Sequence, residues 1–381
     1  MNRIEHIAVI CREAAAEGGV ALVALRHAAQ LAREYRVTLL SDSIPDQLPG
    51  GVDGSLVRRA DFSALRRFAH APNEIAFARA VRRRLFEIDV DFVLCEGDVP
   101  AALAAHRLKR ERGVPFGIVT HGDMAGRPAG TFDRQLSALY RWAERRSASA
   151  ADLVAALGPT MAELGRRRGA REESIAIIPN GVDLRDIGLD PDAPPPARPE
   201  RSFIGMIYAG RLANEKGILV LIDAAHRLRE RGVAFQLTIA GSGPLDEQAR
   251  ARAAGLDVTF LGAQPRTTLG SLFQNADVAV VPSLSEPFGL VLVEALAAGT
   301  PVIATAVDDV PAIVRDGENG LLVPAGDAAA LAAAIESLAV DRDRLRSLAS
   351  SARASVLPRF SWDASGRLLR DAVRARLRHN R

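Results

Sequence analysis

Residues 282–305 read PSLSEPFGLVLVEALAAGTPVIAT, which is the most informative segment of the chain. The apolar run 277–281 before it predicts a buried strand, and residues 301–304 predict the next strand. Between the two strands, a short polar loop leads into a segment typical of a helix, which ends at Gly299. A helix that begins in such a loop offers unpaired N–H groups at its N-terminus, where anionic ligands bind. The stretch therefore predicts a strand–loop–helix–strand unit with a ligand site at its loop.

The same alternation of strand-like and helix-like segments extends in both directions along the chain. In the first half the predicted strands are 4–10, 36–40, 92–95, 116–120, 153–157 and 174–178. In the second half they lie near 203–209, 234–240, 257–261, 277–281, 301–304 and 320–323. Strands that alternate with helices predict parallel sheets covered on both faces. Since 381 residues are more than one core usually holds, we predict an α/β protein of two doubly wound, Rossmann-like domains.

A turn cluster and a proline-rich segment separate the two halves. Residues 179–183 read PNGVD and residues 190–199 read DPDAPPPARP, a composition typical of linkers. We place the first domain at 1–182 and the second at 183–358, followed by a C-terminal helix at 359–381. Residues 45–73 show little periodicity, and their secondary structure is assigned only loosely.

Composition limits the classes of function. The chain is 48% apolar and 25% charged, as in globular proteins, and its net charge of +3 is too small to indicate nucleic-acid binding. No uninterrupted apolar run is long enough for a membrane span, and the N-terminus does not resemble a signal peptide. Cys11 and Cys95 lie in apolar strand-like runs without metal-ligand spacing. We therefore expect a reducing, cytoplasmic location.

The loop at residues 208–217, YAGRLANEKG, carries two cations. Gly210 allows the backbone to turn after a strand, and Arg211 and Lys216 flank a short loop that opens a helix. Lys216 is one of only two lysines in the chain. A guanidinium and an ammonium group at a helix N-terminus suit a diphosphate. The alternative is a solvated pair of surface charges.

The helix in the opening stretch combines free N–H groups with a carboxylate. Phe288 and Gly289 place backbone N–H groups at its start, which suits phosphate or sugar hydroxyls. Glu294 lies farther along in an apolar run, and a buried carboxylate needs a partner. Two vicinal ribose hydroxyls would provide one, and a nearby arginine is the alternative.

A third loop at residues 240–245 reads AGSGPL and lacks the last glycine of a dinucleotide fingerprint. We interpret it as a strand-to-helix turn that could pass beneath a nucleotide base.

Two of these motifs together resemble the retaining glycosyltransferases of family 4, which have the GT-B fold. They are GRLANEKG at 210–217 and the pattern that begins with EPFG at Glu286 and ends at Glu294. Supporting resemblance lies in PNGVD at 179–183, DGENGLLV at 316–323 and FSW at 360–362, and, more thinly, in Gly18-Gly19 and in THG at 120–122. The resemblance implies two domains that face a central cleft and a C-terminal helix that returns to the first domain. It also implies a nucleotide-sugar co-substrate, with no cofactor and no metal.

The resemblance implies a role for each matching residue of the second domain. Arg211 and Lys216, next to Gly210, would hold the donor diphosphate and stabilise the leaving group, which replaces a divalent metal. Glu294 would bind the ribose hydroxyls. Glu286 and the backbone of three residues would meet the donor sugar: Phe288, Gly289 and Leu290.

In the first domain the resemblance implies fewer roles. Gly18 and Gly19 would approach the diphosphate from the opposite domain. His121 ends a strand and would lie near the donor sugar and the reacting carbon, although a structural role is an equal alternative. Glu96 and Asp98 also follow a strand, and they would either bind acceptor hydroxyls or cap the next helix.

Two further features have alternatives. Asp89 and Asp91 match the spacing of a metal-binding D-x-D motif, but they precede a strand, whereas such a site belongs after one. The basic segment 78–86 could contact an anionic membrane surface at the periphery of the cytoplasm, beside a lipid acceptor. A solvated helix face whose apolar stripe lies in the core is the favoured interpretation.

We therefore expect a glycosyltransferase of the EC 2.4 class that moves a sugar from a UDP- or GDP-sugar to an acceptor hydroxyl. The acceptor classes that remain open are glycans, lipid-linked molecules and small molecules, and no nucleic-acid partner is expected. A nucleotide-sugar epimerase or isomerase of the same fold is one alternative, but it would need more acid–base groups than His121. A non-catalytic nucleotide-sugar-binding protein is the other.

Overall fold

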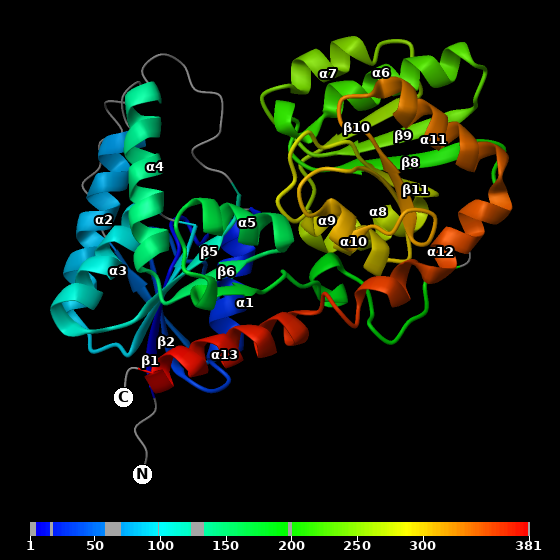
Figure 1. The fold of residues 1–381 in the computed structure, drawn as a ribbon. Helices are drawn as coiled ribbons and strands as arrows, with labels where there is room; N and C mark the ends of the chain where they lie inside the picture. Colours follow the sequence, from blue (N-terminus) through cyan, green and yellow to red (C-terminus); the bar gives the residue numbers. More distant parts are fainter. Residues whose placement is uncertain are drawn as a thin grey trace. The chain divides into compact units, whose positions relative to one another are not determined.

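The computed structural model describes residues 5–15, 18–57, 70–97, 99–122, 133–196 and 200–379. The chain forms two compact units (Figure 1). Unit 1 consists of Met1–Pro179 and Ser365–Arg381, and unit 2 consists of Asn180–Ala364. The unit boundaries therefore lie at 179/180 and 364/365, where the sequence analysis expects 182/183 and 358/359.

Unit 1 contains a parallel sheet of seven described strands in the order β3-β2-β1-β4-β5-β6-β7. The strands are β1 (His6–Ile10), β2 (Arg36–Ser41), β3 (Val52–Leu56), β4 (Phe92–Glu96), β5 (Phe116–Thr120), β6 (Leu153–Ala156) and β7 (Ile175–Ile177). In the centre of the sheet, Ile7 of β1 pairs with Val37 on one side and Phe92 on the other. The sequence analysis predicted each of these strands except β3.

The helices of unit 1 cover this sheet. They are α1 (Gly19–Leu31), α2 (His70–Glu87), α3 (Val99–Arg112), α4 (Asp133–Ala150), α5 (Pro159–Arg167) and α13 (Trp362–His379), with a short 3-10 helix at Glu172–Ser174. The C-terminal helix packs on α1, because the guanidinium of Arg370 donates to the Gln30 side chain at 2.8 Å and to Glu34 at 3.0 Å. The expected return of the C-terminal helix to the first domain is thus confirmed.

The basic segment 78–86 belongs to α2. Its apolar residues Val81 and Leu85 are fully buried in the core of unit 1. Arg82 and Arg83 on the same helix are exposed. The favoured interpretation, a solvated helix face with its apolar stripe in the core, is confirmed. Among the described helices, none is both long enough and apolar enough to cross a membrane.

Unit 2 contains a parallel sheet of six strands in the order β10-β9-β8-β11-β12-β13. They are β8 (Ile204–Ala209), β9 (Phe235–Ala240), β10 (Val258–Gly262), β11 (Val278–Val281), β12 (Val302–Thr305) and β13 (Gly320–Val323). All six lie where the alternation of the sequence predicted them. The order of the strands reverses between β8 and β11, which marks the switch point where such sheets bind ligands.

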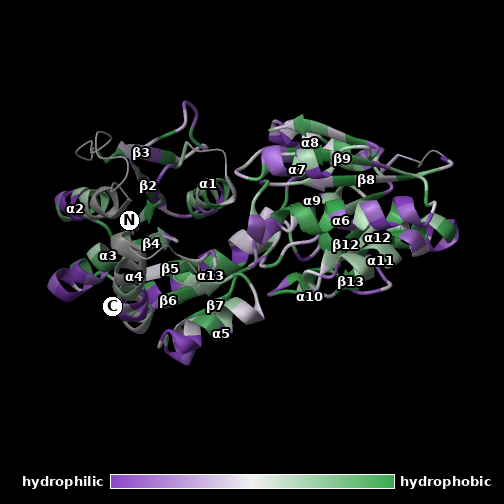
Figure 2. Cartoon of the chain, turned by 90° about the horizontal axis from the view of Figure 1, so that it is seen from above, coloured by the Kyte–Doolittle hydropathy of each residue, from purple (hydrophilic) through white to green (hydrophobic). Residues whose placement is uncertain are grey.

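Helices lie on both faces of this second sheet, with α6 and α7 on one side and α8 and α9 on the other (Figure 1). They are α6 (Ile218–Glu230), α7 (Asp246–Arg252), α8 (Arg266–Asn275), α9 (Leu290–Ala297), α10 (Val310–Ile313), α11 (Ala328–Val340) and α12 (Arg342–Val356), with 3-10 helices at Leu184–Ile187 and Asn214–Lys216. Figure 2 shows hydrophilic and hydrophobic residues alternating along the helices, as amphipathic helices on a sheet require.

Candidate active site

Two loops meet at the carboxyl edge of the second sheet, next to the switch point. One follows β8 and the other follows β11, and these strands are hydrogen-bonded neighbours. The N–H of Leu284 donates to the carbonyl of Glu215 at 2.8 Å. Gly217, with φ +67°, lies so close to the other loop that a Cβ there would be 1.9 Å from the Pro282 carbonyl oxygen. The loops predicted from the sequence to form the site are therefore in direct backbone contact.

This contact brings Lys216 and Glu286 together. The ammonium Nζ of Lys216 lies 2.7 Å from Oε2 of Glu286, and the Ser283 hydroxyl donates to the same oxygen at 3.0 Å. The backbone N–H of Glu286 donates to the Asp308 carboxylate at 2.6 Å. Glu286 is buried, and Lys216 is partly exposed. The loop thus holds one carboxylate rigidly beside a cation that solvent can reach.

Arg211 lies on the outer side of the first loop. Its side chain is 54% exposed and pairs with Glu215. The Tyr208 hydroxyl donates to the backbone carbonyl of Arg211 at 2.7 Å. Burial, helped by the charge of Glu286, raises the pKa of Tyr208 above its ordinary value. Tyr208 therefore stays a neutral donor that fixes the loop.

The glycine-rich loop 240–245 packs beneath the Gly210 loop, as the interpretation of a strand-to-helix turn requires. The N–H of Gly210 donates to the Ala240 carbonyl at 2.9 Å. A Cβ at Gly241 would lie 1.8 Å from the Gly210 carbonyl oxygen, and a Cβ at Gly243 would lie 2.4 Å from that of Leu212. These glycines allow the two loop backbones to pack closely.

The first turn of α9 presents N–H groups as the sequence predicted. Gly289 precedes the helix with φ +85°, and no side chain caps the helix there. The side chain of Phe288 is buried and packs edge-on against Phe360, with ring centroids 5.8 Å apart. Phe288 therefore offers a ligand only its backbone, and Leu290 is the first residue of the helix.

Glu294 is buried in α9 and pairs with Arg266. An arginine partner is the alternative that the sequence analysis named, and it satisfies the carboxylate without a ligand. Arg266 is the first residue of α8, just after the loop that follows β10. The sequence analysis did not single out Arg266, although its place after a strand-end loop and a proline is a signal that could have found it.

In unit 1, His121 immediately follows β5, and its partner is Glu96 at the end of β4. Nε2 of His121 lies 2.9 Å from Oε2 of Glu96, and Nδ1 of His27 lies 2.7 Å from Oε1. The expectation that Glu96 binds acceptor hydroxyls or caps a helix is wrong, because its side chain is fully buried between two imidazoles. Asp98 lies outside the described residues.

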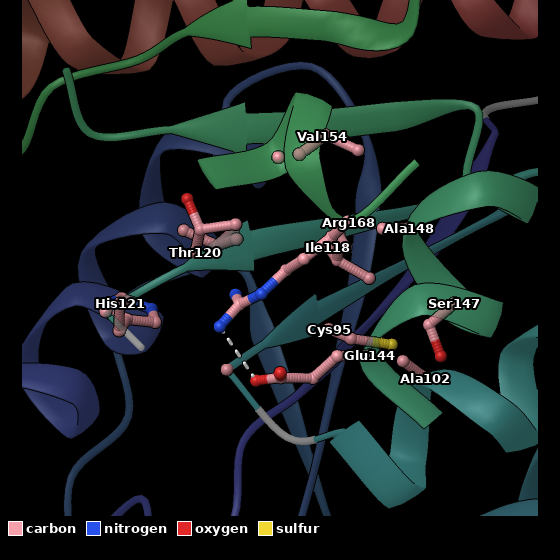
Figure 3. Close-up of a pocket in the computed structure, with 14 residues that line it drawn as sticks. Cys95, Ala102, Ile118, Thr120, His121, Glu144, Ser147, Ala148, Val154 and Arg168 are labelled. Atoms are coloured by element: carbon pink, nitrogen blue, oxygen red, sulfur yellow. Dashed lines mark ion pairs between the residues drawn. The ribbon is translucent and has the colours of Figure 1, made fainter. Parts of the chain in front are cut away.

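A small cavity lies beside His121 (Figure 3). Its volume is about 50 Å³, enough for a few water molecules. Thr120 and His121 line one side, and the ion pair of Arg168 with Glu144, at 3.1 Å, lies within it. The buried hydroxyl of Ser147 also lines it and has no hydrogen-bond partner among the described residues.

Gly18 and Gly19 lie at the start of α1 and are exposed. The backbone of Gly18 is extended, with φ −172°, and a Cβ there would meet nothing within 4 Å. Neither the backbone conformation nor the space around Gly18 therefore requires a glycine.

The aspartates of the D-x-D motif lie at the opposite end of β4 from Glu96. The Asp91 carboxylate accepts the backbone N–H of His6 at 2.8 Å, so it ties β1 to β4. In the described part of the chain, no group of three or more His, Cys, Asp or Glu side chains is placed to hold a metal ion. The second lysine, Lys109, pairs with Asp152 at 2.6 Å in unit 1.

Two family models match the chain: "Glycosyltransferase Family 4" matches residues 17–186, and "Glycosyl transferases group 1" matches residues 196–355. The glycogen synthase of Mycobacterium tuberculosis is 35% identical over 257 residues, which are 65% of this chain and 60% of that protein. The chain thus spans well under two thirds of this relative.

Solved structures share the whole fold. The sucrose-phosphate synthase of Thermosynechococcus elongatus superposes with a TM-score of 0.81 at 24% identity, covering 97% of this chain and 98% of the other. HepE of Anabaena, solved with UDP and glucose, superposes with a TM-score of 0.74 at 19% identity, covering 98% and 100%. With its two parallel-sheet units, the chain belongs to the group 1, family 4 glycosyltransferases of the GT-B fold.

Proposed function

We propose that the protein is a retaining glycosyltransferase that moves a sugar from a nucleotide diphosphate-sugar to an acceptor hydroxyl without a metal ion. One observation carries the proposal: Lys216 and Glu286, from two neighbouring strand-end loops, meet at 2.7 Å at the switch point of the second sheet. A cation and a carboxylate at such a point suit a diphosphate and a sugar. The family of the chain supports the same reaction class.

In the proposed donor complex, the cations exchange their present partners for phosphate. Lys216 now pairs with Glu286, and Arg211 pairs with Glu215. Both cations reach solvent. A diphosphate could therefore replace the two carboxylates as their partner at little desolvation cost. As the bond to the sugar breaks, negative charge grows on the leaving phosphate, and the two cations together with the α9 N-terminus would stabilise it.

Glu294 is proposed to accept hydrogen bonds from the two ribose hydroxyls. Its pairing with Arg266 is compatible with this role, because a carboxylate has enough acceptor sites to serve a guanidinium and two hydroxyls together. Glu286 and the N–H groups of Phe288, Gly289 and Leu290 would hold the hydroxyls of the donor sugar.

His121, Gly18 and Gly19 are proposed to contact the donor during transfer, His121 at the sugar and the glycines at the diphosphate. We propose no dedicated general base. The acceptor oxygen would bond to the anomeric carbon on the face that the leaving group vacates, and the departing phosphate oxygen would take the acceptor proton. These steps retain the anomeric configuration, and the acceptor proton ends on the leaving phosphate.

The donor and the acceptor classes are proposed from the similar proteins. A UDP-sugar is the first choice, with a GDP-sugar second, because the similar HepE structure holds UDP and glucose. Glycan acceptors come first because the sequence relative reported above is a glycogen synthase. Lipid-linked and small-molecule acceptors follow as further candidates.

A donor screen followed by a transfer assay tests the proposal. UDP-, GDP- and ADP-sugars are compared by thermal shift, and each binder is then incubated with acceptors in the presence and absence of EDTA. We expect a product of retained anomeric configuration, read by NMR, and unchanged rates with EDTA. An epimerised donor without acceptor would indicate an isomerase instead, and binding without turnover on any acceptor would indicate a nucleotide-sugar-binding protein.

A further inference from the structure

Three residues far apart in the sequence meet at the carboxyl edge of the first sheet. Glu96 is the last residue of β4, His27 lies on α1, and His121 follows β5. The two oxygens of Glu96 are divided between the two rings, at 2.7 Å from His27 Nδ1 and 2.9 Å from His121 Nε2. The side chains of Glu96 and His27 are fully buried, and that of His121 is 9% exposed.

The positions of the protons follow from the chemistry of the carboxylate. Burial alone would raise the pKa of Glu96, but the charges and hydrogen bonds of His27 and His121 outweigh burial and lower it to about 2. Glu96 is therefore ionised at neutral pH, and an ionised carboxylate only accepts hydrogen bonds. His121 must then donate from Nε2. In its neutral ring the proton sits on Nε2, which makes Nδ1 a hydrogen-bond acceptor.

The backbone next to Glu96 confines the ring of His121. Gly97 has φ +67°, and a Cβ at this position would lie 3.0 Å from Cδ2 of His121. A side chain at residue 97 would therefore crowd the ring. His27 holds the second oxygen of Glu96, so the carboxylate cannot turn without losing a buried hydrogen bond.

We propose that Glu96 is a positioning residue that fixes His121 in the Nε2–H tautomer, so that Nδ1 accepts a hydrogen bond from a hydroxyl of the donor sugar. This inference rests on the proposed function, in which His121 contacts that sugar. His27 completes the arrangement by holding the carboxylate in place. A packing role alone would not need the charge, because a glutamine has nearly the same shape.

The substitution Glu96→Gln separates these roles. A carboxylate accepts from two N–H donors, whereas an amide offers one acceptor and one donor group. One of the two imidazoles must therefore turn or change its tautomer, although the volume of the side chain is conserved. Glu144→Gln is the matched control, because Glu144 is buried in the same unit and lines the cavity beside His121, but it pairs with Arg168.

For variants that fold, kcat and the KM for the nucleotide-sugar test the proposal. We expect kcat to fall roughly tenfold to a hundredfold in Glu96→Gln, with the KM for the nucleotide-sugar within about threefold of the wild type, since His121 acts on the reacting sugar. Glu144→Gln should keep kcat within about threefold, because it leaves the Glu96–His121 contact in place. Equal losses of kcat in both variants, or no loss in Glu96→Gln, would overturn the proposal.

The tautomer of His121 in the wild-type protein keeps the proposal testable even if Glu96→Gln does not fold. ¹⁵N NMR of the imidazoles, with His121→Gln to assign the signals, should show the His121 proton on Nε2. A proton on Nδ1 overturns the proposal. This measurement needs no substrate, so a wild-type protein that transfers no sugar would contradict the proposed function and leave the tautomer result standing on its own.

Discussion

The two units hold their charged groups in opposite ways. In unit 2, the side chain of Lys216 is 30% exposed and pairs with a single carboxylate in a neighbouring loop. In unit 1, Glu96 is fully closed off from solvent and both of its oxygens are engaged by imidazoles. A partly solvated ion pair can exchange one partner for a ligand, whereas a buried network resists any change of partner. Unit 2 is therefore suited to binding and releasing an anion. Unit 1 is suited to fixing the orientation of the His121 imidazole.

The largest expected effect is on kcat, after removal of the Lys216 ammonium group. Lys216→Ala should lower kcat roughly 100- to 1,000-fold, because it removes a charge that stabilises the leaving phosphate. Transfer assays at saturating UDP- or GDP-sugar would measure it. Lys109→Ala is the control, because the only other lysine pairs with Asp152 in unit 1. Activity in Lys216→Ala that stayed near the wild type and vanished with EDTA would point to a metal mechanism.

The next effect concerns the contact between the two loops of unit 2. Gly217→Ala should lower the free energy of unfolding by about 3–4 kcal/mol, since it adds a Cβ to a left-handed residue and drives it into the Pro282 carbonyl. Gly232→Ala is the control, with a similar φ of +73° and open space around the Cβ. It should lose only about 1–2 kcal/mol. Equal losses in urea denaturation would mean that the loops do not touch as described.

The buried carboxylate of unit 1 predicts a pH dependence of stability. Because the pKa of Glu96 is lowered from 4.5 to about 2, its contribution is complete above about pH 4.5 and is lost as the pH falls toward 2, by up to about 3 kcal/mol. Urea denaturation of the wild type and of Glu96→Gln from pH 7 to 3 would measure it. The variant should be less stable at pH 7 and lose less stability in acid. Parallel curves would contradict the pKa of Glu96.

The smallest expected effect is on nucleotide binding. Glu294→Ala should weaken the binding of UDP or GDP roughly tenfold, because the ribose hydroxyls lose a charged acceptor. Isothermal titration calorimetry would measure the dissociation constant, with circular dichroism to verify the fold. Glu336→Ala is the control, because this carboxylate pairs with Arg231 on the exposed surface of unit 2. Unchanged affinity in Glu294→Ala would show that the ribose assignment is wrong.

Most of the fold followed from the sequence because buried parallel strands are apolar along their whole length. The strand β3 was missed for the opposite reason. Its sequence is VDGSL, it lies at the edge of the sheet, and its residues are mostly exposed. Its conformation depends on pairing with β2, from Val37↔Val52 to Ser41↔Leu56, and not on its own composition.

The site of unit 2 was more predictable than that of unit 1. Lys216 and Glu286 each belong to a loop that directly follows a strand, and neighbouring parallel strands bring such loops together. The sequence analysis did not identify Arg266 or His27, because each contacts a partner that is distant in sequence. A histidine on the apolar side of a helix, such as His27, has no local signal that distinguishes it from a core residue.

The contact of Gly217 with Pro282 also bears on how the donor specificity of this chain could be redesigned. The segments 210–217 and 282–289 contact each other through backbone atoms, at Gly217 with Pro282 and at Glu215 with Leu284. Replacing one segment with that of a relative would therefore strain the other. A graft that alters the donor should therefore exchange both segments together.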